Sequence, residues 1–185
     1  MKPKVISVFG GSSPLPGTPP YDEARQLGRL LAEAGFAVAT GGYSGTMEAA
    51  SRGAAEAGGH VIGVTCRHLE RVFARLGANA WVKEEIPYET LRDRLNHLVE
   101  KCDAAMALPG GIGTLSEVAL TWSLLQTREI PLKPFVLIGE NWRASLHTFY
   151  HSADGYVPAE HWQLLAFAPD VHTAARSVTQ SLKEN

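Results

Sequence analysis

This 185-residue chain has few cysteines, little net charge and no long apolar run, and each of these features excludes a class of protein. It has two cysteines, Cys66 and Cys102, which stand alone and lack the spacing of a zinc site. Two lone cysteines fit a reducing compartment and predict packing residues rather than a disulfide framework. The formal net charge is −2, and the Lys and Arg residues are scattered. We therefore expect no nucleic-acid polymer as a partner.

Long apolar runs are also missing. The apolar run nearest the start, Val5–Phe9, is too short for a secretory signal, and no later run approaches the length of a membrane span. We therefore expect a cytoplasmic protein that has no membrane partner. What the chain does have is 45% hydrophobic residues, enough to bury one core without disulfides or a structural metal. No repeat or linker divides it, so residues 1–185 are predicted to form a single domain.

Short patterns typical of buried parallel strands alternate with helical patterns along the chain. This alternation predicts an α/β fold with a doubly wound parallel sheet flanked by helices. The expected strands are Val5–Phe9, Ala37–Thr40, Val61–Thr65, Ala80–Val82, Ala104–Leu108 and Phe135–Ile138. The expected helices are Pro20–Ala34, Gly45–Ala57, Tyr88–Lys101, Thr114–Thr127, Trp142–His151 and Val171–Lys183, with a shorter one over His68–Leu76.

Three loops that follow predicted strands are rich in glycine: Gly10–Ser13, Gly41–Glu48 and Leu108–Glu117. Ligands of an open parallel sheet bind outside the carboxyl ends of its strands. Glycine lets backbone N–H groups approach an anion at the start of the following helix. Any one of these loops can equally be a tight turn, but three together predict a phosphate cradle. None has the spacing of a dinucleotide fingerprint or a P-loop, which disfavours NAD and ATP chemistry.

Several side chains in these loops have two interpretations. Thr114 and Glu117 have the spacing of a capping box, although a carboxylate at this helix start also faces the ligand crevice. Glu48 either stabilises a helix start or contacts a substrate. Tyr43 either packs or stacks on a base. The seven histidines show no metal-ligand spacing, so we expect no metal.

The run PGGIGTLSE, residues 109–117, resembles the P-G-G-x-G-T-x-x-E signature of the Lonely Guy (LOG) type nucleoside-monophosphate phosphoribohydrolases, often mislabelled as lysine decarboxylases. VFGGSSP, ATGGYSGTMEAASRGAAEAGGHVIGV, QTREIPLKPFVLIGENW and ADGYVPAEHWQLLAFAPDV resemble further segments of that family, so the likeness covers nearly the whole chain. The resemblance implies a Rossmann-like fold, usually a homodimer, that needs no cofactor. It implies hydrolysis of the N-glycosidic bond of a nucleoside 5′-monophosphate, such as AMP or a cytokinin nucleotide, to free base and ribose 5-phosphate.

The resemblance also implies site residues, with Arg94 and Glu117 as the catalytic pair. The alternative for Arg94 is a surface position on a helix, paired with Asp93 or Glu89. The candidate substrate-binding residues are Gly11, Ser12, Gly42, Glu48, Gly110, Gly111, Gly113 and Thr114.

Some positions depart from the family's pattern. Leu95 stands where a lysine is common, and Tyr43 and Ser44 replace a Gly-Pro pair, while Ser116 and Leu120 stand where acidic residues are frequent. These departures leave open a rival function, a protein of the same fold that binds a nucleotide or molybdenum cofactor without turnover. A second rival, pyridoxal-phosphate-dependent lysine decarboxylation, is disfavoured because no lysine lies in the glycine loops.

Overall fold

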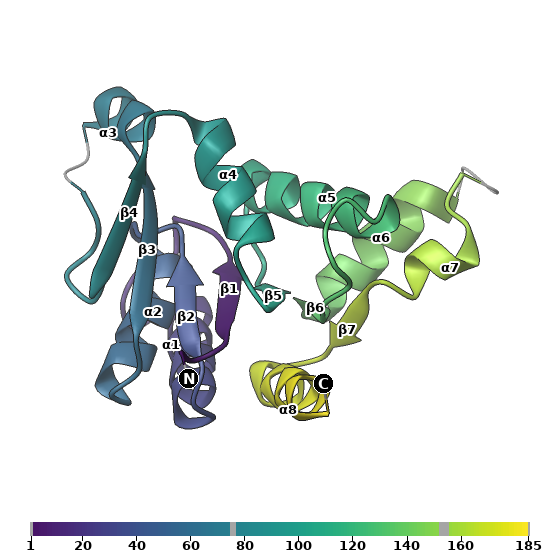
Figure 1. The fold of residues 1–185 in the computed structure, drawn as a ribbon, viewed down its shortest axis with the longest axis horizontal. Helices are drawn as coiled ribbons and strands as arrows, with labels where there is room; N and C mark the ends of the chain where they lie inside the picture. The colour runs from purple at the N-terminus through teal and green to yellow at the C-terminus, as the bar shows by residue number, and fades with distance from the viewer. Residues whose placement is uncertain (1, 75–76, 152–155, 185) are drawn as a thin grey trace.

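The fold is described by a computed structural model for residues 2–74, 77–151 and 156–184. Seven parallel strands form one sheet in the order β4-β3-β2-β1-β5-β6-β7 (Figure 1). The strands are β1 (Val5–Phe9), β2 (Ala37–Thr40), β3 (Val61–Cys66), β4 (Glu84–Tyr88), β5 (Ala104–Ala107), β6 (Phe135–Ile138) and β7 (Ala166–Ala168). The predicted α/β sheet is thereby confirmed. Because the strand order reverses between β1 and β5, a crevice is expected at their carboxyl ends.

Helices cover both faces of the sheet (Figure 1). One face carries α1 (Pro19–Glu33), α2 (Thr46–Glu56) and α8 (Val171–Lys183). The other carries α4 (Leu91–Glu100), α5 (Ile112–Gln126), α6 (Glu140–His151) and the short α7 (Ala159–Trp162). The remaining helix, α3 (Arg67–Phe73), follows β3 directly. No helix in the described ranges is both long and apolar enough to cross a membrane.

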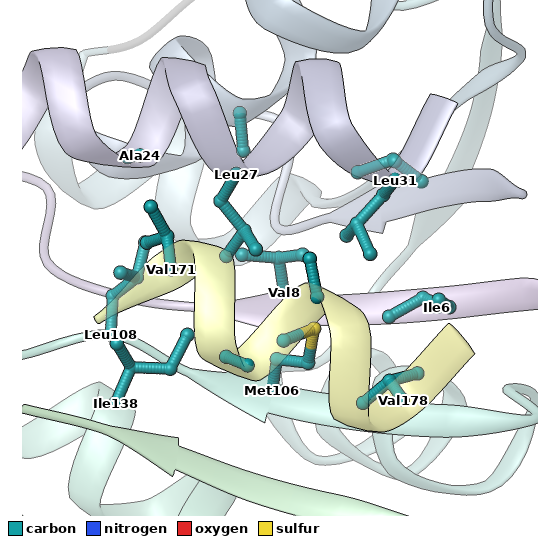
Figure 2. Close-up of a cluster of buried hydrophobic side chains, with 14 of the residues drawn as sticks. Ile6, Val8, Ala24, Leu27, Leu31, Met106, Leu108, Ile138, Val171 and Val178 are labelled. Atoms are coloured by element: carbon teal, nitrogen blue, oxygen red, sulfur yellow. The ribbon is translucent and has the colours of Figure 1, made fainter. Parts of the chain in front are cut away.

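Each face has its own apolar core, because successive side chains of a strand point to opposite sides of the sheet. Val8 of β1 belongs to the core beneath α1 and α8, whereas its neighbour Phe9 belongs to the core beneath α4 and α5. Figure 2 shows the first of these cores, to which Leu27 of α1, Val178 of α8 and Met106 of β5 all belong. The sheet is therefore held from both sides, and the ends of its central strands are fixed.

The two edge strands, β4 and β7, and the short helix α7 differ from the prediction. Residues 80–82 are not a strand, and the fourth strand is β4, whose Glu84, Glu85 and Pro87 hid it from an apolar pattern. An edge strand tolerates such residues because one side of it has no strand partner. The three-residue strand β7 and the short α7 were not predicted, and the predicted end of α3 at Leu76 lies outside the described residues.

Helices α1 and α2 approach backbone to backbone. A Cβ atom on Gly28 of α1 would overlap the carbonyl of Ala50, and one on Gly53 of α2 would overlap the carbonyl of Arg25. Helices pack this closely only where the contact carries no side chain. The contact fixes α2, and with it the loop that leads from β2 into α2.

We predict that Gly28→Ala destabilises the protein by about 2 kcal/mol or more, because the new methyl group has no room. Gly113→Ala is the matched control: Gly113 is also helical, but a Cβ there meets nothing within 4 Å. Helix propensity alone favours alanine at both positions. Urea unfolding should show a loss for Gly28→Ala and no loss for Gly113→Ala, and equal effects would contradict the packing argument.

Candidate functional site

A cavity of about 450 Å³ lies at the carboxyl end of the sheet, where the strand order reverses. Its place and size are typical of a small-molecule site. The walls come from the loops after β1, β2 and β5 and from helices α2, α3, α4 and α5. The lining residues are Gly10, Gly11, Ser12, Tyr43, Met47, Leu69, Phe73, Leu91, Arg94, Gly111, Ile112, Gly113, Thr114 and Glu117.

The three glycine loops pack against one another at this point. The carbonyl of Gly11 accepts hydrogen bonds from the Thr46 N–H at 2.9 Å and from the Thr46 hydroxyl at 3.0 Å. A Cβ on Gly10 would overlap that hydroxyl, and a Cβ on Gly110 would come within 2.9 Å of the backbone nitrogen of Gly11. These two glycines are therefore needed for the close approach of the loops, which leaves the more open positions of the loops for a ligand.

Helix α5 begins at Ile112, two residues before its predicted start, with Gly111 as the N-cap. Thr114 is therefore inside the first turn, and the predicted capping box with Glu117 is wrong. Gly111 supplies no side-chain cap, and a Cβ on Gly111 or Gly113 would meet nothing within 4 Å. The start of α5 therefore presents to the pocket N–H groups that no described residue accepts, together with the positive end of its dipole.

Arg94 is buried, with 6% of its surface exposed, so the predicted surface alternative is wrong. Its Nε–H donates to the Val64 carbonyl at 2.8 Å, and Nη2 donates to the Gly41 carbonyl at 3.1 Å. Asp93 and Glu89 have other partners. Within the described part of the chain, the N–H groups of Nη1 make no hydrogen bond. They remain available for a ligand.

Glu117 projects from α5 into the same pocket and is also buried. Its carboxylate accepts no hydrogen bond from the residues that the structure describes. Burial raises the pKa of Glu117 to about 7, although the nearby positive charge of Arg94 acts to lower it. The carboxyl group can therefore exchange a proton near neutral pH, and such groups cluster at functional sites.

The structure brings most of the predicted site residues together. Those that line the pocket are Gly11, Ser12, Arg94, Gly111, Gly113, Thr114 and Glu117. Gly42, Glu48 and Gly110 are outside the lining. Glu48 instead accepts a hydrogen bond from the Tyr21 hydroxyl at 3.2 Å, which joins α2 to α1. The carbonyl of Gly42 accepts the N–H of Asn79 at 2.7 Å.

The apolar wall of the pocket was not predicted. It consists of Met47 on α2, Leu69 and Phe73 on α3, Leu91 on α4 and Ile112 on α5. Ile112 is 80% exposed. An apolar residue inside a glycine loop was a signal in the sequence that this position could contact a ligand. The two residues of α3 gave no such signal, because only the tertiary fold brings that helix to the pocket.

Two positions at which the chain departs from the LOG pattern have different surroundings. Leu95 packs against the core beneath α4 and does not line the pocket. Tyr43 is 5% exposed, so it is a packing residue, as one of its two interpretations predicted. One part of the side chain also lines the pocket. In the described ranges, no group of three or more His, Cys, Asp or Glu residues is placed to hold a metal ion.

Residues 3–138 match the family described as the SLOG cluster4 family, which is nearly three quarters of the chain. The chain belongs to this family. The SLOG protein is 33% identical to a cytokinin riboside 5′-monophosphate phosphoribohydrolase of Arabidopsis thaliana, over 89% of this chain and 78% of the relative. It is 32% identical to the protein of that name from Rhodococcoides fascians, over 84% of this chain and 79% of the relative. These matches confirm membership of the LOG group.

Solved structures share the fold of this SLOG protein. The molybdenum cofactor binding protein of Rippkaea orientalis superposes with a TM-score of 0.77 at 27% identity, over 98% of this chain and 99% of that one. The molybdenum cofactor carrier protein of Chlamydomonas reinhardtii superposes with a TM-score of 0.73 at 29% identity, over 99% of both chains. The Rossmann-like fold implied by the sequence is thus confirmed.

We predict that Glu117→Gln stabilises the protein above pH 7 and has little effect near pH 4.5. In the unfolded chain this carboxyl group loses its proton near pH 4.5, whereas the folded protein keeps the proton to about pH 7. Between these values the wild type loses stability as pH rises, because a charge must be buried. The gain for the variant should reach up to about 3 kcal/mol at pH 8. Urea unfolding at pH 4.5 and 8 measures it, and an equal gain at both would contradict the assignment.

Proposed function

We propose that this protein hydrolyses the N-glycosidic bond of a nucleoside 5′-monophosphate, either AMP or a cytokinin riboside monophosphate, to free base and ribose 5-phosphate. The observation that carries the proposal is the buried Glu117 carboxylate, which accepts no hydrogen bond from the described residues and shares its pocket with Arg94 and the start of α5. The relatives named as phosphoribohydrolases support it.

The reaction separates charge, and the pocket holds one side chain of each sign. Breaking the bond between C1′ and the base nitrogen leaves positive charge on the ribose, while the electron pair leaves on the base. Ionised Glu117 accepts hydrogen bonds from the ribose hydroxyls and stabilises the developing cation. It also orients the attacking water and takes a proton from it as the water oxygen bonds to C1′.

The phosphate end of the substrate is held by groups that bind it and take no part in breaking the bond. The free N–H groups at the start of α5 and the Thr114 hydroxyl bind its oxygens, with help from Ser12 on the loop after β1. The Nη1 group of Arg94 provides the positive charge that steadies the anionic side of the ligand. Binding at this end fixes the ribose against Glu117, which raises the rate through positioning.

A second candidate function is a carrier that binds a nucleotide or molybdenum cofactor and leaves it intact. The observation that favours it is the superposition, over nearly the whole chain, with two proteins named for molybdenum cofactor binding. A carrier needs the phosphate-binding start of α5 but has no use for a buried Glu117 that titrates near neutral pH. Incubation with AMP separates the two functions. AMP would raise the melting temperature of a carrier, and no adenine would be released.

We predict that purified protein releases free base from AMP or another nucleoside 5′-monophosphate, measured by chromatography. Glu117→Gln should lower kcat by about 10²–10⁴-fold, because the variant can neither carry the negative charge nor take the water proton. Arg94→Ala should lower kcat/KM by at least about tenfold. The control is Glu33→Gln, on an exposed carboxylate at the end of α1, which should leave the rate unchanged. Hydrolysis that survives in both site variants would disprove the assigned roles.

We also propose that the protein is a homodimer that uses the exposed face of α5. Trp122 and Leu125 on this helix point into the core, where the Trp122 indole N–H donates to the His161 carbonyl at 2.8 Å. Leu115, near the start of the same helix, is exposed, and a second copy of the chain would cover it.

Light scattering after gel filtration should therefore show a dimer for the wild type and a monomer for Leu115→Glu. Leu132→Glu is the control, because Leu132 is similarly exposed but does not belong to α5. This variant should remain a dimer. A monomeric wild type at micromolar concentration would contradict the proposal.

A further inference from the structure

Tyr43 is the aromatic residue that lies against the charged side of the pocket. It is 5% exposed, and its ring centroid is 5.6 Å from the Cζ atom of Arg94. A guanidinium group over an aromatic face is attracted by the negative charge of the ring, and the attraction is larger where both are buried. The loop pattern of the LOG family often has glycine at this position, so this contact depends on a residue in which the chain departs from the pattern.

The ring of Tyr43 is fixed at its far end. The phenolic oxygen accepts the N–H of Cys66 at 2.7 Å. The same hydroxyl lies 3.1 Å from the Cys66 carbonyl and 3.2 Å from the Glu70 carboxylate, either of which accepts its proton. Burial raises the pKa of Tyr43 to about 12, so the hydroxyl stays protonated and keeps donating at physiological pH. The end of β3 and the start of α3 therefore hold the ring in one orientation.

The Arg94 guanidinium is thus enclosed on several sides. The carbonyls of Val64 and Gly41 accept two of its N–H groups, and the Tyr43 ring covers part of its surface. A Cβ on Gly41 would overlap Nη2, so the guanidinium group lies directly against the backbone at this point. We propose that Tyr43 is a positioning residue: its anchored ring holds the Arg94 guanidinium in the pocket that Arg94 shares with Glu117.

This inference rests on the proposed function only for its effect on rate. Its effect on the free protein is independent of any substrate, because the charge of Arg94 lowers the pKa of Glu117. If Arg94 moves away when the ring is removed, the pKa of Glu117 rises. If removal of the ring only loosens the packing and admits water, the pKa of Glu117 falls, because the ionised form is then better solvated.

The first experiment measures the pKa of Glu117 by carbon NMR in the protein without ligand, with Glu117→Gln used to assign the signal. Tyr43→Leu should raise the pKa of Glu117 by about half a unit or more. Arg94→Met, which removes the positive charge completely, should give the largest rise that loss of this charge can cause. In the Arg94→Met background, Tyr43→Leu should add no further rise. No change, a fall, or an equal rise in both backgrounds would overturn the proposal.

The second experiment measures kcat/KM for AMP hydrolysis in the same four proteins. Tyr43→Leu should lower it by at least about fivefold in the wild-type background and by less than about twofold when Arg94 is already methionine. A wild type that cleaves no monophosphate would disprove the proposed function, and the NMR measurement would still decide the role of Tyr43.

The matched control is Tyr21→Leu. Tyr21 is also a buried tyrosine whose hydroxyl donates to a glutamate at 3.2 Å, but it lies on α1 and contacts Glu48. Its loss should lower the melting temperature without changing the pKa of Glu117 or kcat/KM. A pKa rise in Tyr21→Leu as large as that in Tyr43→Leu would show a general packing effect and overturn the proposal. If Tyr43→Leu does not fold, Tyr43→Phe takes its place, because it loses only the anchoring hydroxyl. A rise in the pKa of Glu117 in this variant would support the proposal, and a fall or no change would overturn it.

Discussion

Three loops can meet at the end of this sheet only because their contact points carry no side chain. Neighbouring strands lie about 4.8 Å apart, so the loops that continue β2 and β5 both leave the sheet beside the loop that continues β1. A Cβ on Gly10 would overlap the Thr46 hydroxyl, and a Cβ on Gly110 would come within 2.9 Å of the Gly11 backbone nitrogen. The contact fixes where α2 and α5 begin, and with them the part of the pocket that the glycine loops form.

Two opposite charges in one apolar cavity are a second constraint. A buried guanidinium costs free energy unless its N–H groups find acceptors, and Arg94 finds them in the backbone carbonyls of Val64 and Gly41. Glu117 has no comparable support from the described residues, so its negative charge is disfavoured in the empty protein. A ligand that offers hydroxyl donors supplies what the protein leaves out, and the carboxylate therefore favours the bound state.

The sequence was sufficient for those parts of the fold in which burial determines residue type. Fully buried strands such as β2 and β6 contain only small or apolar side chains and a threonine, and their predicted limits agree with the structure. β4 was misplaced because an edge strand needs no apolar pattern, and its first three residues are Glu84, Glu85 and Ile86. Helix starts were displaced where a bare glycine acts as the N-cap, as Gly111 does for α5.

The candidate site was predictable where local motifs carry it and not where the tertiary fold assembles it. Arg94 and Glu117 were found through a resemblance that spans the chain, and the structure places both in one pocket. The apolar wall was missed because Leu69 and Phe73 reach the pocket only through the position of α3. Tyr43 had two interpretations in the sequence, and only its buried hydroxyl contacts with Cys66 and Glu70 show what fixes it.

Helix α3 contains no buried residue, although its side chains form one wall of the pocket. Substitutions at Leu69 or Phe73 therefore change the shape of the cavity at little cost in folding free energy. The wall formed by Gly10 and Gly11 has less freedom, because a side chain at either position would press against a neighbouring loop. A lineage that keeps this fold can thus change the shape of the ligand that the pocket accepts by altering one exposed helix, while the loops at the strand ends stay the same.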